Sequence, residues 1–166
     1  MKRILKKIFI ALLVVLVLIQ FYPRPAKNNS TVTAAKSIDQ VHAVPDDVMQ
    51  LLKTSCYDCH SNQTYYPWYS RIQPVALWLD DHIKEGKSEL NFSEFGSYSV
   101  RRQYRKLEEI NEQVKEGEMP LQSYTLIHRN ASLDKAQQLL LASWTAALRD
   151  SFKANYHPDS LARLKK

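Results

Sequence analysis

The stretch "TSCYDCHSN", residues 54–62, decides how the rest of the sequence is interpreted. Cys56 and Cys59 are the only cysteines of the 166-residue chain, and His60 follows the second one directly. Two cysteines at this spacing are compatible with a disulfide, half of a zinc site, a thiol redox centre or a haem attachment site. The surrounding sequence distinguishes between them.

Three of these four interpretations fit the sequence poorly. A disulfide between Cys56 and Cys59 would close so small a loop that it would constrain little of the unfolded chain. A structural zinc site needs four protein ligands, and no second Cys or His pair is present to complete one. A thioredoxin-like centre would follow a strand in a βαβ unit, whereas this motif ends a predicted helix.

Haem attachment accounts for the motif from Cys56 to His60. Residues three apart on a helix project from one side, so both thiols can form thioether bonds with the two vinyl groups of one haem. His60 then offers its imidazole to the iron as the proximal ligand. The sequence therefore predicts a single covalently bound haem c.

The other face of the iron needs a second ligand, and Met119 is the first candidate. It lies in "EGEMPLQSY", residues 116–124, in a glycine-containing loop between two predicted helices. A thioether is a soft, neutral ligand that favours ferrous iron. His128 is the alternative ligand, and His82 is a third choice.

The segment that follows the motif, "QTYYPWYSRIQP" at residues 63–74, is rich in aromatic residues. Its aromatic side chains are candidates for the walls of the porphyrin site, with ordinary core packing as the competing interpretation. Trp68, through its indole N–H, and Arg71 are the candidates for hydrogen bonds to a haem propionate.

The pattern of apolar residues predicts an all-α domain. The chain has three glycines, and no segment shows the sustained alternation that is typical of strands. Gly117 is expected to end the third of the predicted helices. The apolar spacing predicts helices over about 45–56, 74–86 and 99–116, and from about 132 onward.

The formal net charge of +6 is concentrated at the N-terminus. Residues 1–27 hold six basic and no acidic residues, whereas residues 28–166 hold 17 of each. A neutral domain argues against nucleic acid as a partner. Residues 1–22 join a basic start to an apolar run, and no small-residue cleavage site follows it. This pattern predicts an uncleaved signal-anchor, with a cleaved signal peptide as the alternative.

The anchor fixes the expected location and organisation of the chain. The positive-inside rule would place the rest of the protein in the periplasm or another extracytoplasmic space, where haem c is attached. The chain is therefore expected to have four parts: a membrane anchor at 1–22, a flexible tether at 23–44, a haem-binding domain at 45–153 and a C-terminal tail at 154–166.

Several segments together resemble the small bacterial haem-binding domain family of the c-type cytochromes. The resemblance covers about residues 40–152. The segments that carry it are Cys56-Tyr57-Asp58-Cys59-His60-Ser61-Asn62, Pro67-Trp68-Tyr69-Ser70, Pro74-Val75, Leu90-Asn91-Phe92-Ser93 and Gly117-Glu118-Met119-Pro120.

A broader similarity to class I cytochromes c implies further features. Trp144 would pack where the first and last helices of the domain cross. The carbonyl of Pro67 or Pro74 would accept a hydrogen bond from Nδ1 of His60 and so orient the imidazole.

The predicted function is electron transfer. The protein is expected to be an electron carrier and not an enzyme, exchanging single electrons with an unidentified redox partner protein. The alternative is a haem-based gas or redox sensor, or a small haem enzyme, with an open distal site. That alternative needs a vacant or displaceable position on the iron.

Overall fold

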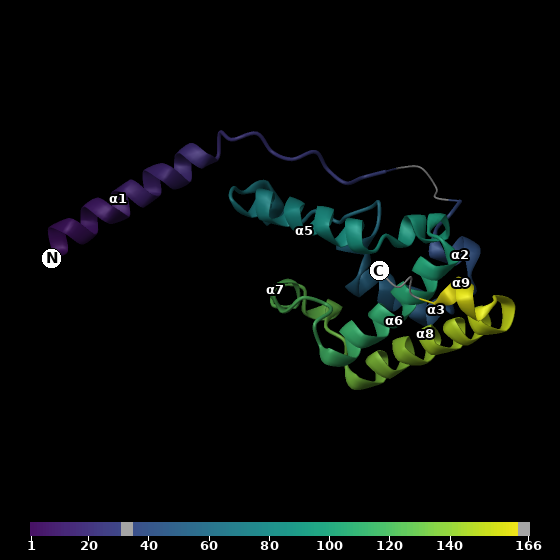
Figure 1. Ribbon diagram of the computed structural model, residues 1–166. Helices are drawn as coiled ribbons and strands as arrows, with labels where there is room; N and C mark the ends of the chain where they lie inside the picture. Colours follow the sequence, from purple (N-terminus) through teal and green to yellow (C-terminus); the bar gives the residue numbers. More distant parts are fainter. Residues whose placement is uncertain (31–34, 163–166) are drawn as a thin grey trace.

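The computed structural model describes residues 1–30 and 35–162 (Figure 1). Residues 31–34 of the predicted tether and 163–166 of the predicted tail lie outside the described residues. The described residues form helices and no strand, apart from an isolated bridge between Asn29 and Gln63. The prediction of an all-α protein is therefore confirmed.

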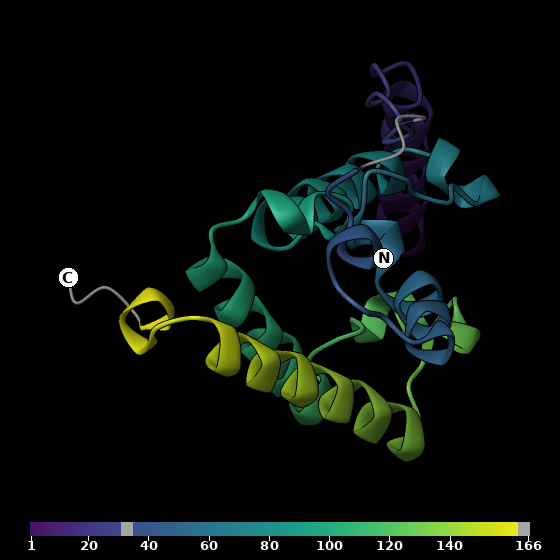
Figure 2. The ribbon, with the colours of Figure 1, turned by 90° about the vertical axis from the view of Figure 1, so that its right-hand side faces the viewer.

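Three helices form most of the core. α6 (Val100–Glu116) and α8 (Lys135–Asn155) run along each other, and α3 (Asp46–Ser55) packs against α8 (Figures 1 and 2). Apolar side chains from these helices and from the segments before α3 and after α5 meet between them. The buried residues of this cluster are Ile38, Val48, Leu52, Leu90, Phe92, Phe95, Leu107, Val114, Leu141, Trp144 and Phe152.

The ends of these helices follow local sequence signals. The Ser99 hydroxyl accepts a hydrogen bond from the Arg102 amide at the start of α6. Gly117 ends α6 with φ of 75°, in the left-handed region that glycine adopts without steric cost. Asp134 and Gln137 form a capping box at the start of α8.

A further long helix packs against the Cys-x-x-Cys-His motif. α5 (Val75–Glu89) packs against the short α4 (Tyr57–His60), which contains most of the motif. The other short elements connect and cover the longer ones. They are α2 (Ile38–Val41), η1 (Trp68–Arg71), η2 (Phe92–Ser97), α7 (Gln122–Thr125), η3 (Arg129–Ala131) and α9 (Pro158–Leu161).

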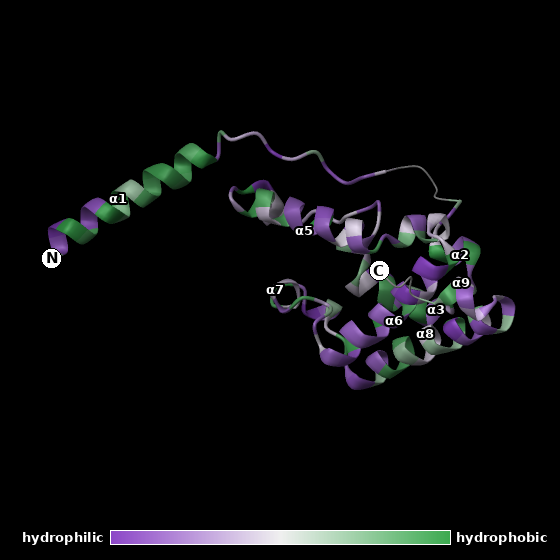
Figure 3. Cartoon of the chain, in the orientation of Figure 1, coloured by the Kyte–Doolittle hydropathy of each residue, from purple (hydrophilic) through white to green (hydrophobic). Residues whose placement is uncertain are grey.

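The N-terminal helix α1 (Lys2–Ile19) does not bear out the predicted membrane anchor. Among the described residues, no helix combines the length and the apolar character needed to cross a membrane. The first turns of α1 carry Lys2, Arg3, Lys6 and Lys7, visible as its hydrophilic end in Figure 3. The remaining apolar run of α1 is only about 18 Å long at 1.5 Å per residue, against about 30 Å of hydrocarbon. The prediction of a membrane anchor is therefore wrong, and the expected location in the periplasm or another extracytoplasmic space, which was derived from that anchor, loses its support.

Candidate haem site

The Cys-x-x-Cys-His motif forms a tight turn between two helices. α3 ends at Ser55, and Cys56 (φ −127°, ψ −38°) separates it from α4. The Cys56 carbonyl accepts hydrogen bonds from the amides of Cys59 (3.2 Å) and His60 (2.9 Å). The helix predicted over about 45–56 thus ends within a residue of its expected end, and the motif itself forms a new helical turn.

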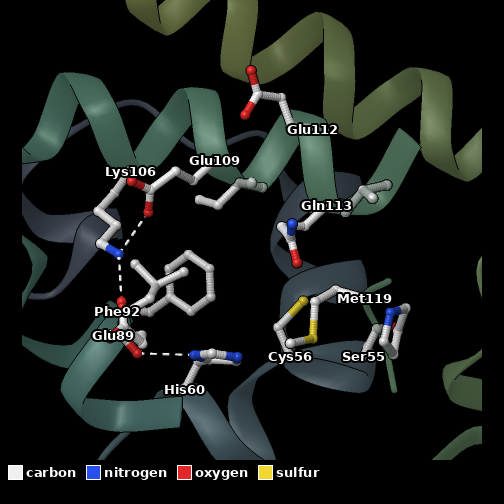
Figure 4. A pocket seen from close by; sticks show the side chains of 14 residues that line it. Ser55, Cys56, His60, Glu89, Phe92, Lys106, Glu109, Glu112, Gln113 and Met119 are labelled. Carbon is white, nitrogen blue, oxygen red and sulfur yellow. Dashed lines mark hydrogen bonds and ion pairs between the residues drawn. The ribbon is translucent and has the colours of Figure 1, made fainter. Parts of the chain in front are cut away.

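The His60 imidazole is held by the C-terminal end of α5. Its Nδ1 lies 2.9 Å from the Gly86 carbonyl oxygen and 3.0 Å from the Leu90 carbonyl oxygen. Because both partners only accept, Nδ1 carries the hydrogen and Nε2 keeps its lone pair. Figure 4 shows the second ring nitrogen of His60 directed toward the side of the cavity occupied by Cys56 and Met119. Burial holds the pKa of His60 below its usual value, so the neutral ring is favoured.

This arrangement corrects the expectation that a proline carbonyl orients His60. The acceptors are Gly86 and Leu90, not Pro67 or Pro74. The Gly86 carbonyl also accepts the Leu90 amide at 2.9 Å, so its oxygen uses a second lone pair for His60, and the Leu90 carbonyl lies just beyond the end of α5. A Cβ added at Gly86 would lie 2.9 Å from the Cys59 carbonyl oxygen. Glycine at this position therefore permits the close contact between α4 and α5.

Both cysteines are unpaired and line the cavities next to His60. Burial raises the pKa of the Cys56 thiol to about 12 and that of the Cys59 thiol to about 11. Reactive redox or zinc-binding cysteines instead have lowered pKa values, which favour the thiolate. The motif thus presents two neutral thiols to the same cavity, in keeping with attachment of a largely apolar group.

Two adjoining cavities lie along the motif, with volumes of about 290 and 260 Å³. Together they reach the size that is typical of cofactor pockets. Phe92 and Ile110 contribute apolar wall to the first cavity, and Leu121 and Tyr124 to the second. Six residues line both cavities: Ser55, Cys56, His60, Glu89, Met119 and Pro120.

Met119 reaches these cavities from the loop after α6. The Gln113 carbonyl accepts hydrogen bonds from the amides of Glu118 (3.0 Å) and Met119 (3.2 Å) directly after the Gly117 cap. The end of α6 therefore fixes the backbone of the candidate second ligand. The structure places Met119 and His60, which lie far apart in the sequence, in the walls of the same two cavities.

The two alternative histidines occupy different places. His82 lines the second cavity, and its Nδ1 is bonded to the Trp78 carbonyl oxygen at 2.8 Å. His128 lines neither cavity; it is bonded through Nε2 to the Tyr69 hydroxyl and stacks on Tyr124 with ring centroids 4.4 Å apart. The structure therefore brings His82, and not His128, together with His60 and Met119.

Trp68 and Arg71 are not brought to the motif. Both belong to η1, where Trp68 is 75% exposed, and neither lines the cavities beside His60. Arg71 instead lines a third cavity with Arg24 and Lys27. Their predicted contact with a haem propionate has no counterpart in the geometry of the site.

Lys106 is a residue of the site that sequence reasoning missed. Its side chain lines the first cavity, and its Nζ lies 3.1 Å from Glu89 Oε2 and 2.6 Å from Glu109 Oε2 (Figure 4). In the sequence, Lys106 is one of several charged residues along a helix, and nothing there shows that its side chain is buried. Only the packing of α6 against the end of α5 distinguishes it.

Comparison with known proteins connects this geometry to a family. The model of the family described as "Haem-binding domain" matches residues 14–147. The chain belongs to this family. No curated protein and no solved structure matches the chain.

The side chains of this haem-binding-domain protein fit the group that the family name implies. Within residues 1–30 and 35–162, no group of three or more His, Cys, Asp or Glu side chains could hold a bare metal ion. Haem iron makes a smaller demand, because the porphyrin already supplies four nitrogen ligands. His60, with Nδ1 fixed and Nε2 available, and Met119 across the shared cavity would complete such a coordination sphere.

Proposed function

We propose that this haem-binding-domain protein is a c-type cytochrome with one covalent haem, and that it carries single electrons to and from an unidentified redox partner. The observation that carries the proposal is the state of His60. Two backbone carbonyls hold its Nδ1–H, and Nε2 remains available in a cavity lined by both cysteines. Hydrogen bonds to the ring nitrogen that does not bind the metal fix the tautomer and raise the basicity of a ligating histidine.

Cys56 and Cys59 would hold the haem covalently. Their partly buried, neutral thiols belong to one short turn and line the cavity beside His60. The spacing of two residues between them, with histidine next, is the signature of c-type attachment. Covalent attachment also keeps the cofactor in place through every redox cycle.

Met119 would be the second protein ligand of the iron. The iron of a bound haem supplies one-electron exchange between its ferrous and ferric states. A histidine and a methionine that both bound the iron would leave no open position for a substrate, which supports an electron carrier over an enzyme. The similarity to class I cytochromes c in the motif and the Met-Pro loop supports the same reading.

One observation favours a second candidate function, a gas or redox sensor. His82 lines the cavity that Met119 also lines, and its hydrogen bond to Trp78 leaves Nε2 available. A histidine beside a displaceable methionine could replace it, or assist a small ligand bound to the iron. In this candidate function, the distal position opens.

Optical spectroscopy of the haem-loaded chain tests both candidates. We expect a six-coordinate spectrum and a weak far-red iron–methionine band, which Met119→Ala abolishes while allowing carbon monoxide to bind. Met49→Ala is the matched control, because Met49 contacts Tyr57 and does not line the two cavities. Mass spectrometry of the denatured protein tests the thioether bonds, which Cys56→Ala and Cys59→Ala would each reduce by one.

Other results contradict the proposal. Carbon monoxide binding by the unmodified ferrous protein favours the sensor. A six-coordinate spectrum that survives Met119→Ala but is lost in Met119→Ala/His82→Ala assigns the ligand to His82; loss only on addition of His128→Ala assigns it to His128. Release of haem from the unmodified denatured chain excludes covalent attachment.

A further inference from the structure

Two cationic side chains of α6 contact the last turn of α5, the turn that also holds His60. Lys106 Nζ lies 3.1 Å from Glu89 Oε2. Arg102 Nη2 donates to the carbonyls of Ser88 (3.0 Å) and Glu89 (3.4 Å). These contacts lie between Gly86 and Leu90, whose carbonyls accept from His60 Nδ1. We refer to Arg102 and Lys106 as the α6 clamp.

The α6 clamp is built into the packing and is not a loose surface pair. Lys106 is only 5% exposed, and Glu109 Oε2 at 2.6 Å gives it a second carboxylate. The Arg102 guanidinium lies 4.1 Å from the centre of the Tyr98 ring. Of the residues that line the two cavities beside His60, Lys106 is the only lysine or arginine. Loss of the Lys106 side chain would remove both of these ion pairs, whereas loss of the Glu89 charge would remove only the pair that joins α6 to the end of α5.

We infer that the α6 clamp positions the two carbonyls that hold His60 Nδ1–H, and thereby sets the strength of His60 as an iron ligand. The inference rests on the proposed function in that His60 is taken as the ligand. Lys106 and Arg102 are positioning residues, since each acts through the end of α5. A well-placed pair of acceptors strengthens the Nδ1–H hydrogen bond, makes the ring a stronger donor and favours ferric iron.

A test must separate the electrostatic effect of the Lys106 and Glu89 charges from their effect on the position of the two carbonyls. Removing the Lys106 charge lowers the reduction potential by electrostatics, whereas removing the Glu89 charge raises it. Loss of position weakens the Nδ1–H hydrogen bond in both cases. The behaviour of the His60 Nδ1 proton therefore distinguishes a positioning role from a purely electrostatic one.

The experiment compares four variants of the full, haem-loaded chain: Lys106→Met, Glu89→Gln, Lys106→Arg and Lys84→Met. The control, Lys84→Met, breaks an exposed ion pair with Asp80 on α5, away from the last turn. The readout is exchange of the His60 Nδ1 proton in the ferrous protein, measured by NMR with ¹⁵N-labelled histidine. We expect exchange to be at least about tenfold faster in Lys106→Met and in Glu89→Gln. We expect it to stay within about twofold of the unmodified protein in Lys106→Arg and Lys84→Met.

Unchanged exchange in Lys106→Met or in Glu89→Gln overturns the inference, as does an equal change in Lys84→Met. Glu89 is exposed, so Glu89→Gln remains informative even where Lys106→Met does not fold. A chain that binds no haem contradicts the proposed function alone. In that case the ¹⁵N shifts of His60 in the haem-free chain report the fraction of the Nδ1–H tautomer. The fraction of the Nδ1–H tautomer falls in Lys106→Met and in Glu89→Gln if the clamp acts as inferred. An unchanged fraction overturns the inference.

Discussion

His60 receives its orientation from two backbone oxygens and its neutral state from burial. The bonds to Gly86 and Leu90 would hold either a neutral or a charged ring, since Nδ1–H donates in both. Burial decides between them by penalising the charged form. A ring held in this way needs little rearrangement before Nε2 meets a metal.

The lowered pKa of His60 predicts how the stability of the haem-free chain depends on pH. In the unfolded chain His60 binds a proton near pH 6.5, whereas in the fold it does so only at lower pH. The unfolded state therefore binds more protons as the pH falls through this window. We expect the free energy of unfolding to decrease below about pH 6.5, by at most about 1.4 kcal/mol per pH unit from this group.

Urea unfolding of the haem-free chain at pH 7.5 and pH 5.5 measures this effect. His60→Gln is the control, because it removes one titrating group and leaves the other histidines unchanged. The decrease in stability between the two pH values should be smaller in His60→Gln than in the unmodified chain. Equal decreases would show that burial of His60 does not contribute.

Tyr124 supports the motif through Asp58, the residue that precedes Cys59. The Tyr124 hydroxyl donates to Asp58 Oδ2 at 2.7 Å, and the Tyr65 amide donates to Asp58 Oδ1 at 2.9 Å. Burial, aided by the Asp58 carboxylate, raises the pKa of Tyr124, so its hydroxyl stays a donor. We expect Tyr124→Phe to cost about 1–2 kcal/mol of unfolding free energy in urea. Tyr65→Phe serves as the matched control, since that ring is 72% exposed, and it should cost less than about 0.5 kcal/mol.

At the scale of the elements, helices with strong local signals were predicted from the sequence. The predicted helix 99–116 corresponds to α6, with Ser99 and Gly117 as its caps. The helices predicted at 45–56, at 74–86 and from about 132 correspond to α3, α5 and α8, with ends that differ by a few residues. Capping residues and apolar spacing act over four residues or fewer, so a sequence reveals them directly.

The separate helical turn α4 after Cys56 was not predicted, because its direction depends on a contact between elements. α4 must turn away from α3 to lie against Gly86 on α5. No local residue signals that turn. The same reason explains why the acceptors of His60 were missed: Gly86 and Leu90 are 26 and 30 residues away along the chain.

The contact at Gly86 gives a prediction for α5. Alanine normally stabilises the interior of a helix relative to glycine by about 1 kcal/mol. Here the added Cβ would meet the backbone oxygen of Cys59 at 2.9 Å, and that oxygen belongs to the motif turn. We expect Gly86→Ala to lower the free energy of unfolding by about 1–3 kcal/mol and to reduce haem incorporation.

Chemical denaturation and haem absorbance per chain measure the two effects. Ser88→Ala on the same helix is the control, because this exposed side chain bonds only to the Glu85 carbonyl one turn earlier. Its stability should change by less than about 0.5 kcal/mol. A Gly86→Ala protein with normal stability and normal haem content would contradict this prediction, because α4 and α5 could then move apart without a cost in unfolding free energy.

At the scale of the whole molecule, Trp144 joins the two ends of the domain. It is 7% exposed on α8, and its Nε1–H donates to the Ala43 carbonyl, just before α3, at 3.3 Å. This position agrees with the expected crossing of the first and last helices of the domain. Trp144→Ala would leave a large cavity and an unpaired carbonyl.

We expect Trp144→Ala to cost about 3–5 kcal/mol of unfolding free energy. Thermal and urea unfolding followed by circular dichroism measure the loss. Leu139→Ala, at a 63% exposed position on the same helix, is the control and should cost less than about 1 kcal/mol. Similar losses in both variants would contradict a central role of Trp144 in the core.

The candidate site was predicted in part from the sequence, and the remainder depends on the whole fold. Cys56, Cys59 and His60 are adjacent, so their chemistry could be interpreted without a fold. Met119 lies beside them only because α6 ends next to the motif. The Gly-x-Met-Pro sequence of the loop nevertheless identified Met119 as a candidate ligand. His82 and Lys106 line the cavities only because of how α5 and α6 pack, and the apolar spacing along the sequence does not specify that packing.

The hydrogen bonds of Asn28 have a consequence for how far the chain can be shortened. Its Nδ2 donates to the Ser61 carbonyl and to Thr64 Oγ1, both at 2.9 Å, and its backbone amide donates to the Tyr66 hydroxyl at 2.7 Å. All three partners lie in the six residues after His60. A protein trimmed to begin at residue 45 would lose these hydrogen bonds, and we expect the loop that follows His60 to become accessible to proteases. Trimming to residue 24 should leave the loop resistant, so limited proteolysis of the two shortened forms would locate the true start of the functional unit.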